Sequence, residues 1–569
     1  MKRALLAFGV LLCCRFLPAT GAPVPLRPTV ADSTKDLFLL GKVWGFLKYF
    51  HPAVTGGKYD WDSALIHFLP EYDAATGRTG KSDALLAWIN RLGNVNRCKD
   101  CRDTLMKGAK LRPDFSWINK GNFSPALVSK LAFIRDNRSL DSQFYIVLHP
   151  AEGAFLPLPQ HEKQYLYVHY PDKIYGLLAL FRFWNTIEYW YPYKYHLKTS
   201  WDNVLLEMIP RMSTELNPAQ YYSDAERMAV NLQDSHGWLS GLQELEEYGH
   251  YMFPFTAKLV ERRLVVTSIL NDSLAKAAGV QKGDVIDSID SKDVWAIAQE
   301  LAAYCPASTE ASLWNKLSYK ITRTHNRQSR LTIENENGQK TVLTSNLPYS
   351  YFVATDFTPA YFKYPTDSAF CMLPGGICYI NMGRLDRKDS VTLEEMVRAS
   401  RSLIIDDRQN ADEANGTGAV DIVARLVLPP NRFFFRFSSA EPSYPGVWSL
   451  RKPANMGVPA GPDYYKKRIA ILINENSTSV GEFMTMAYQQ SPTARLFGTP
   501  TAGADGPANA ILLPGGVYVQ FTNMGVYYPD GKETQRVGIQ PDVMVPQTLD
   551  GYRHQKDEQM DKAIEWLTP

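Results

Sequence analysis

The chain has little that would direct it to nucleic acid, a metal or a bilayer. Its 61 basic and 59 acidic residues leave a formal net charge of +2, which gives no electrostatic reason to expect a nucleic-acid partner. The sequence contains no GxxxxGK[ST] loop, no HExxH zinc motif and no EF-hand pattern, so neither a nucleotide nor a metal cofactor is indicated. Beyond the amino terminus, no stretch is long and apolar enough for a membrane span.

The amino terminus has the pattern of a secretory signal. Two basic residues precede an apolar run over residues 4–14, and small residues follow, with cleavage expected after Gly21. A lipoprotein signal at one of the two cysteines in this run is the weaker alternative, because a bulky leucine precedes the first of them. Residues 1–21 therefore predict export, to a periplasm or to the cell surface.

Cysteines are few, and export makes them interpretable. The chain has 7, of which Cys98 and Cys101 form a CxxC pair. This pair could be a redox motif or half a zinc site, but no second CxxC and no thioredoxin-like context accompany it, which favours a local structural disulfide. Cys371 and Cys378 either pair or are buried thiols. The odd number outside the signal leaves at least one thiol free.

An internal repeat dominates the first half of the chain. With 569 residues the chain should form several domains, and residues 33–165 and 170–248 each predict a helical module built on related aromatic helices. We expect the repeated aromatic residues to be packing residues and not a ligand site. Seven identities share an offset of 140 positions: Trp44 and Trp184, Tyr49 and Tyr189, Pro52 and Pro192, Trp61 and Trp201, Asp62 and Asp202, Leu65 and Leu205, Pro70 and Pro210.

The second half of the chain contains two regions with different sequence patterns. Residues 252–346 contain short alternating runs and the segment AAGVQKGDVIDSIDSKDV, which predict a compact β-rich domain. This segment resembles a PDZ domain, a fold that binds the end of an extended peptide as an added strand. Residues 355–565 alternate apolar strands with helices and predict an α/β domain. The fold class expected is therefore multidomain, α+β followed by α/β.

The segment ENSTSVGEFM follows the strand-like run RIAILIN and opens a helical pattern. A turn between a buried strand and a helix presents its side chain outward and aims backbone N–H groups at what lies in front, which suits Ser479 as a nucleophile. The motifs LIIDDRQN, TSVGE, GTPTAG, LPGG and GIQPDV stand in the order seen in C-terminal-processing (tail-specific) serine peptidases, a family that includes the tricorn protease. The resemblance implies a ClpP/crotonase-like α/β domain with Ser479 as nucleophile.

The resemblance also directs the search for a base. In one arrangement of this family the base is a lysine downstream of the serine, but residues 492–510 contain no lysine. The chain is more similar to the tricorn branch, in which a Ser-His pair lies in the helical part, here Ser235 and His236 of QDSHGW. An imidazole titrates near neutrality and can take the proton of a serine hydroxyl. The first repeat ends in NVNRCKDC and has no such pair.

The acid and the oxyanion hole depart from the family pattern. The resemblance implies an orienting chain from the histidine through Ser235 to an acid, but the aligned position before GIQPD is Gln535, which carries no charge. Glu533, two residues earlier, would face the same side of a strand, and the choice stays open with a preference for Gln535. The expected oxyanion donors are the N–H of Val480 and that of Gly416 or Gly418.

Together these features predict an exported serine endopeptidase. Ser479 would form an acyl-enzyme with His236 as general base, on a peptide or an unfolded protein whose end the PDZ-like domain receives. No cofactor is expected, and the oligomeric state is left open. The alternative is a non-catalytic protein on the same scaffold that binds a peptide or a hydrophobic ligand, which Gln535 and the altered oxyanion loop keep open.

Overall fold

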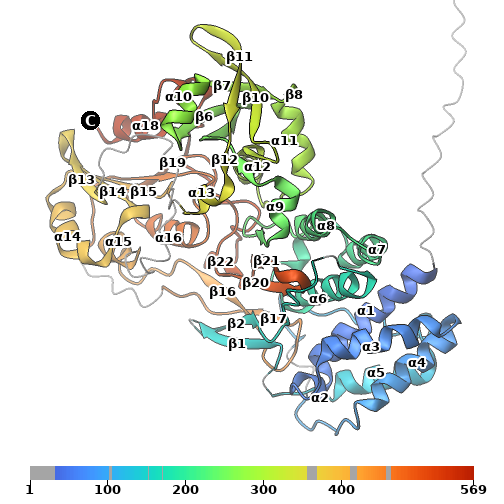
Figure 1. Cartoon of the computed structure of the whole chain (residues 1–569). Helices are drawn as coiled ribbons and strands as arrows, with labels where there is room; N and C mark the ends of the chain where they lie inside the picture. Colours follow the sequence, from blue (N-terminus) through green and yellow to red (C-terminus); the bar gives the residue numbers. More distant parts are fainter. Residues whose placement is uncertain are drawn as a thin grey trace, which may run out of the picture.

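The structure is a computed structural model and has a mixed α and β architecture with several sheets (Figure 1). Helices of the two repeats lie at one end of the molecule, and the β-rich part lies at the other. The predicted signal, residues 1–21, lies outside the described part. No helix in the described ranges is long and apolar enough to cross a membrane. The structure describes residues 32–101, 106–141, 143–151, 153–169, 171–354, 368–409, 420–455 and 463–568.

The two repeats fold into matching sets of helices. In each set the first helix carries the repeated tryptophan and tyrosine, and a later helix begins at a tryptophan that is followed by the repeated aspartate; this is the third helix of the first set and the second helix of the second. The first set consists of α1 (Asp32–Phe50), α2 (Pro52–Thr55), α3 (Trp61–Ala74), α4 (Gly77–Arg91) and α5 (Pro125–Asp136), and the second of α6 (Lys173–Trp190), α7 (Trp201–Met212) and α8 (Pro218–Val230).

In each set, two hydrogen bonds between the repeated tryptophans connect the helix that carries the first tryptophan to the helix that begins with the second. In the first set, the indole N–H of Trp44 donates to the Trp61 carbonyl at 3.2 Å, and that of Trp61 donates to the Trp44 carbonyl at 3.0 Å. The second set has the same reciprocal pair between Trp184 and Trp201, at 2.7 and 2.9 Å. All four indoles are buried and hydrogen-bonded, which is the usual condition of a core tryptophan. The repeated aromatics are core residues.

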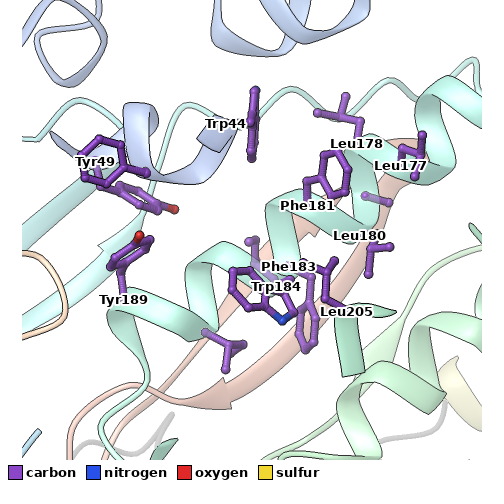
Figure 2. Packing of buried hydrophobic residues seen from close by; sticks show 14 of the residues in the cluster. Trp44, Tyr49, Leu177, Leu178, Leu180, Phe181, Phe183, Trp184, Tyr189 and Leu205 are labelled. Carbon is purple, nitrogen blue, oxygen red and sulfur yellow. The ribbon is translucent and has the colours of Figure 1, made fainter. Parts of the chain in front are cut away.

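The two sets face each other at equivalent positions. The rings of Tyr49 and Tyr189 lie 5.5 Å apart, facing each other in the core (Figure 2). One turn earlier, α1 has Gly45 where α6 has Asn185, and a Cβ on Gly45 would lie 1.8 Å from the Asn185 side chain. Helix α1 can therefore approach α6 closely only because position 45 is glycine. Contact between residues 140 positions apart places a pseudo-two-fold axis between the two sets.

Ion pairs across this axis explain the repeated aspartates. Lys42 of the first set pairs with Asp202 of the second at 2.6 Å, and its counterpart Arg182 pairs with Asp62 of the first, also at 2.6 Å. The two pairs differ in burial, since Asp202 is 39% exposed but Asp62 only 4%. Arg182 also lies 2.9 Å from Glu162, in a cluster that buries both charges.

The β-rich part is a six-stranded antiparallel sheet with its own apolar core. Its strands run in the order β11, β10, β7, β6 and β5, with β8 paired to β7. The predicted Gly-Asp turn precedes β7, with Gly283 at a φ of +93°, a conformation that favours glycine. The elements are β5 (Phe255–Val260), β6 (Arg263–Ile269), α10 (Asp272–Ala278), β7 (Val285–Ile289), β8 (Lys292–Asp293), α11 (Val294–Ala302), α12 (Glu310–Ile321), β10 (Gln328–Asn335) and β11 (Gly338–Ser345).

The last part is built on a mostly parallel sheet covered on both faces. Every residue of β14, β15 and β18 is buried, because alternate side chains enter two different cores, one against α14, α15 and α16 and the other against α18. The elements are β13 (Phe370–Leu373), β14 (Ile377–Asn381), α14 (Ser390–Ala399), β15 (Ser402–Asp406), α15 (Val420–Val427), β18 (Ile469–Ile473), α16 (Val480–Tyr488), β19 (Ala494–Gly498), β23 (Val543–Met544) and α18 (Glu558–Leu567).

A hairpin from the last part packs on the helical body. Strands β20 (Ala508–Leu513) and β21 (Val517–Thr522) lie beside α6 (Figure 1), and their inward residues share one core with the repeats. The short strand β3 (Leu239–Ser240), which follows α8, pairs with β21. The hairpin thereby brings the segment that carries the predicted base to the part that carries the predicted nucleophile.

The cysteines form one local disulfide, as predicted for the CxxC pair. Cys98 and Cys101 form a disulfide. Cys371 and Cys378 lie on the paired strands β13 and β14 but are free thiols, as is Cys305. Cys371 and Cys378 are therefore unpaired thiols and do not form a disulfide.

Candidate active site

Ser479 occupies a strained turn between a buried strand and a helix. It lies between β18 and α16 with a φ of +53° and a ψ of −118°, a conformation that residues with a side chain rarely adopt. Its N–H donates to the carbonyl of Ala504 at 2.9 Å, and its hydroxyl donates to the carbonyl of Gly506 at 3.2 Å. The strain is held by the neighbouring loop, residues 501–506, which begins in the GTPTAG motif (residues 498–503) and extends three residues beyond it.

Glu482 of the SVGE motif anchors that loop. Its buried carboxyl group accepts the N–H of Gly503 at 2.9 Å and that of Ala504 at 2.7 Å, together with the hydroxyl of Thr501. Burial raises the pKa of Glu482 to about 7, against the opposing effect of these hydrogen bonds. The glutamate therefore acts on Ser479 indirectly, because the carbonyls that contact the serine belong to the loop that Glu482 holds.

Ser235 binds the same loop from the other side. Its hydroxyl donates to the carbonyl of Ala502 at 2.8 Å and accepts the N–H of Ser308 at 2.8 Å, while its own N–H donates to the Ser308 hydroxyl at 2.8 Å. The hydroxyl proton thus goes to a backbone carbonyl instead of linking His236 to an acid, as the resemblance had implied. Ser235 and Ser479 each bind a carbonyl of residues 501–506, which brings the two distant segments to one loop.

His236 is 9% exposed and has one ring nitrogen in use. Its Nδ1 lies 2.8 Å from the hydroxyl of Thr522, whereas Nε2 has no hydrogen-bond partner among the described residues. Burial lowers the pKa of His236 below its usual 6.5; the nearby Asp234 opposes this effect and the cation of Lys316 adds to it. The ring is therefore neutral at pH 7 and has a nitrogen available to accept a proton.

Gln535 and Glu533, the two candidates for the family's acid position, lie in different surroundings. Gln535 is buried, and its amide nitrogen lies 3.4 Å from the carboxylate of Asp234, which is two positions before His236 in the chain. Glu533 instead pairs with Lys110 at 2.7 Å, accepts the Tyr195 hydroxyl at 2.7 Å and contacts His196.

The interpretation of Glu533 as a residue beside Gln535 fails for a local reason. Position 533 forms an isolated bridge with Tyr527, and residues 535–537 then turn, with Arg536 at a φ of +67°. Side chains alternate between two faces only along a continuous strand, so the two candidates do not share a face. Glu533 joins the helical body to the last part of the chain and has no contact with the base in the described structure.

Replacing Glu533 with glutamine should lower the stability of the fold by about 2 kcal/mol, because a charged acceptor of three hydrogen bonds is lost. Burial alone would raise the pKa of Glu533, but the hydrogen bonds from His196, Lys110 and Tyr195 lower it from 4.5 to about 2. The stabilisation is therefore complete above pH 4.5 and is lost as the pH falls through about 2. Thermal unfolding of both proteins as a function of pH measures this difference.

The matched control is Asp530→Asn, which removes an exposed carboxylate paired only with Lys532 at 3.2 Å. We expect its melting temperature to stay close to that of the unmodified protein. A Glu533→Gln variant as stable as this control at pH 7 would contradict the assignment.

The oxyanion donors are described only in part. Val480 is the first residue of α16, where the N–H groups have no acceptor within the helix, and it directly follows Ser479. Gly416 and Gly418 lie outside the described residues. Within the described ranges, no three His, Cys, Asp or Glu side chains gather as a metal site.

Two residues beside the base were not predicted. Asp234 directly precedes the SH pair, and its carboxylate accepts the backbone N–H of His236 at 3.0 Å and both the N–H and the hydroxyl of Thr522. Thr522 ends β21, 288 positions along the chain from Asp234. The letters DSH pointed to Asp234 by proximity alone, but nothing in a single sequence pairs it with Thr522.

Comparison with known proteins agrees with this site. Residues 376–545 match the sequence model of Peptidase family S41. A stretch of 84 residues is 33% identical to the carboxy-terminal-processing protease of Bartonella bacilliformis; it covers 15% of this chain and 19% of that protein. The chain thus matches about a fifth of that relative's length. Residues 376–545 are therefore similar to peptidases of family S41, and the resemblance to C-terminal-processing peptidases seen in the motifs is confirmed.

One group of solved structures shares the fold over most of its length. Mature CPAF, solved in complex with lactacystin, superposes with a TM-score of 0.52 at 12% identity, over 69% of this chain and 98% of CPAF. At this level of identity the likeness concerns the fold alone. The chain therefore shares its mixed α and β architecture with CPAF, and its activity has to be argued from its own residues.

Proposed function

We propose that the protein is an exported serine endopeptidase that cleaves peptide bonds through an acyl-enzyme on Ser479, with His236 as general base. The observation that carries this proposal is the shared loop: residues 501–506 bind the strained Ser479 on one side and Ser235, next to the base, on the other. The family match supports a peptidase, and the signal-like residues 1–21 support export.

The chemistry assigns one task to each group. Ser479 Oγ attacks the scissile carbonyl carbon while its proton passes to His236 Nε2, the nitrogen without a partner. The tetrahedral oxyanion is bound by the N–H of Val480, and His236 then gives the proton to the leaving amine. A water molecule, deprotonated by the same nitrogen, hydrolyses the acyl-enzyme. For the first step the Ser479 hydroxyl has to leave the Gly506 carbonyl and turn to Nε2.

The β-rich part is assigned the recognition of a peptide end, in the manner of a PDZ domain. Its helix α12 contacts the loops of both catalytic residues: Lys316 donates to the Gly237 carbonyl at 2.9 Å, and Asn315 donates to Asn476 at 2.7 Å. A peptide that shifts α12 would therefore act on the base and the nucleophile together. This contact supports a coupling between end recognition and cleavage.

The assignment of the nucleophile is tested with a fluorophosphonate probe, which forms a phosphonate ester with an activated serine and releases fluoride. We expect the protein to be labelled on Ser479 and to cleave an unfolded protein substrate, and Ser479→Ala to lose both properties. Thr478→Ala is the matched control, because it removes the neighbouring hydroxyl and leaves the nucleophile. Label that persists in Ser479→Ala would refute the nucleophile. Absence of both label and cleavage in the unmodified protein would favour a non-catalytic binding protein on this scaffold.

A further inference from the structure

We propose that Asp234, acting through the Thr522 hydroxyl, is the carboxylate that orients His236 and stabilises its charged form, in place of an acid at position 535 or 533. The inference rests on the proposed function, since it assigns a positioning role within the same site. Neither Asp234 nor Thr522 touches the reacting atoms.

The direction of the hydrogen bonds follows from proton counting. The Thr522 hydroxyl has one proton and lies 2.9 Å from the Asp234 carboxylate, which can only accept. The hydroxyl therefore donates to Asp234, and its oxygen accepts the proton on His236 Nδ1, 2.8 Å away. This order fixes the tautomer with the proton on Nδ1 and the lone pair on Nε2. A general base for Ser479 needs this tautomer.

The surroundings of Asp234 suit an ionised carboxylate. The side chain is fully buried and accepts four hydrogen bonds: from the N–H of His236 at 3.0 Å, the N–H of Thr522 at 2.7 Å, the Thr522 hydroxyl, and the amide of Gln535 at 3.4 Å. Three of these donors are N–H groups, which cannot reverse their direction. Both oxygens of the Asp234 carboxylate are thus held in place by donors.

The carboxylate is also close enough to act by its charge. Its oxygen lies 3.9 Å from Nδ1 of His236, too far for a direct hydrogen bond but near enough for a substantial Coulomb attraction in a buried site. The imidazolium that forms when His236 accepts the serine proton is therefore stabilised. Gln535 contributes differently, because its amide donates to Asp234 and so supports the acid without replacing it.

The local turn makes this arrangement possible within four residues. Asp234 accepts the N–H of His236 two positions on with its side chain, and the N–H of Gly237 with its backbone carbonyl at 2.9 Å. A side chain that binds the backbone two residues ahead closes a tight turn. The acid and the base thus belong to one preformed turn, and β21 supplies the hydroxyl between them.

The central test is Asp234→Asn, which removes the charge and nearly keeps the shape. We expect kcat/KM to fall by about 10²- to 10⁴-fold with KM little changed, and the rate of fluorophosphonate labelling to fall in parallel. Because the charge of Asp234 raises the pKa of His236, its loss should also move the acid limb of the pH profile of kcat/KM to lower pH. A purely structural role would lower activity without moving this limb.

Two further pairs keep the inference falsifiable if Asp234→Asn folds poorly. Thr522→Val removes the hydroxyl and should lose activity to a similar extent, whereas Thr522→Ser restores it and should recover most of the loss. Gln535→Glu places a second carboxylate beside Asp234, so we expect activity to fall by about tenfold or more through like-charge repulsion. If position 535 were the acid position, the same change would raise activity.

The outcomes separate this inference from the proposed function. Unmodified protein that neither labels nor cleaves refutes the function and the inference together. Active unmodified protein with Asp234→Asn within threefold of its kcat/KM, with Thr522→Val as active as Thr522→Ser, or with a more active Gln535→Glu, refutes the inference and leaves Ser479 and His236 in place.

Discussion

Replacing His236 with glutamine should reduce kcat/KM for peptide cleavage by about 10⁴-fold or more while the protein remains folded. Glutamine can still accept a hydrogen bond from its surroundings, but it cannot take a proton from Ser479. The fold should tolerate the change because His236 Nε2 has no hydrogen-bond partner to lose among the residues that the structure describes. Steady-state cleavage and the rate of fluorophosphonate labelling, measured beside thermal unfolding, test this expectation.

The pH dependence of cleavage by the unmodified protein is an independent test of His236 as the general base. His236 has to be neutral to accept a proton, and its pKa lies below 6.5, chiefly because the ring is buried. The acid limb of the pH profile of cleavage should therefore be centred below pH 6.5. An acid limb centred above pH 6.5 would contradict the assignment of the base to this buried ring.

His250→Gln is the matched control for the His236 variant. His250 is 55% exposed and lies on the surface after α9 (Gln243–Tyr248), 3.7 Å from Glu246. We expect its replacement to leave both cleavage and stability unchanged. A His236→Gln variant that retains more than a tenth of the activity of this control would exclude His236 as the general base.

The sequence offers Ser479 and His236 as candidate nucleophile and base because each lies in a short local motif. The turn at Ser479 follows from a strand with five buried residues, β18, that runs into a helix, and both elements are visible as apolar patterns. His236 was found because only the second repeat continues into QDSHGW. In both cases the signal lies within about ten residues of the chain, a range in which sequence patterns report on structure.

The acid could not be predicted because its environment is assembled from distant segments. Asp234 and Thr522 meet only through the β20–β21 hairpin, which packs on α6 and pairs with β3. Alignment by family pattern selected position 535, where the chain has a glutamine that donates to Asp234, the carboxylate proposed here. A turn at 535–537 also removed the strand alternation on which the case for Glu533 depended.

The repeat matters to the site because the helical body holds this hairpin. Three buried hydroxyl or guanidinium groups of the second set bind its backbone or that of its partner strand: Tyr221 donates to Pro514 at 2.9 Å, Tyr222 donates to Leu239 at 2.8 Å, and Arg182 donates to Leu512. The first set has no such role in the described structure, although its ion pairs are equivalent. The two sets of helices are therefore related by symmetry, but the contacts that position the hairpin with Thr522 come from the second set.

Replacing Arg182 with methionine should lower the free energy of unfolding by about 3–5 kcal/mol, because it leaves the buried Asp62 carboxylate without its cation and leaves Glu162 with Lys48 alone. Arg182 is fully buried between Asp62 and Glu162, which are each only 4% exposed, so water cannot reach either carboxylate. The lost bond to the Leu512 carbonyl would also loosen the hairpin that carries Thr522. Denaturant-induced unfolding measures the stability, and cleavage assays on the folded fraction measure the effect on the site.

The repeat provides its own control in Lys42→Met, at the equivalent position of the first set. Lys42 pairs with Asp202, which is 39% exposed and can be solvated once the lysine is gone, so we expect a loss of only about 1 kcal/mol. The two variants remove one cation each from symmetry-related ion pairs, which differ in the burial of the aspartate and in the further contacts of Arg182 with Glu162 and the Leu512 carbonyl. Equal losses of stability in Arg182→Met and Lys42→Met would show that burial of the carboxylates does not decide the cost, and would contradict the role assigned to Arg182.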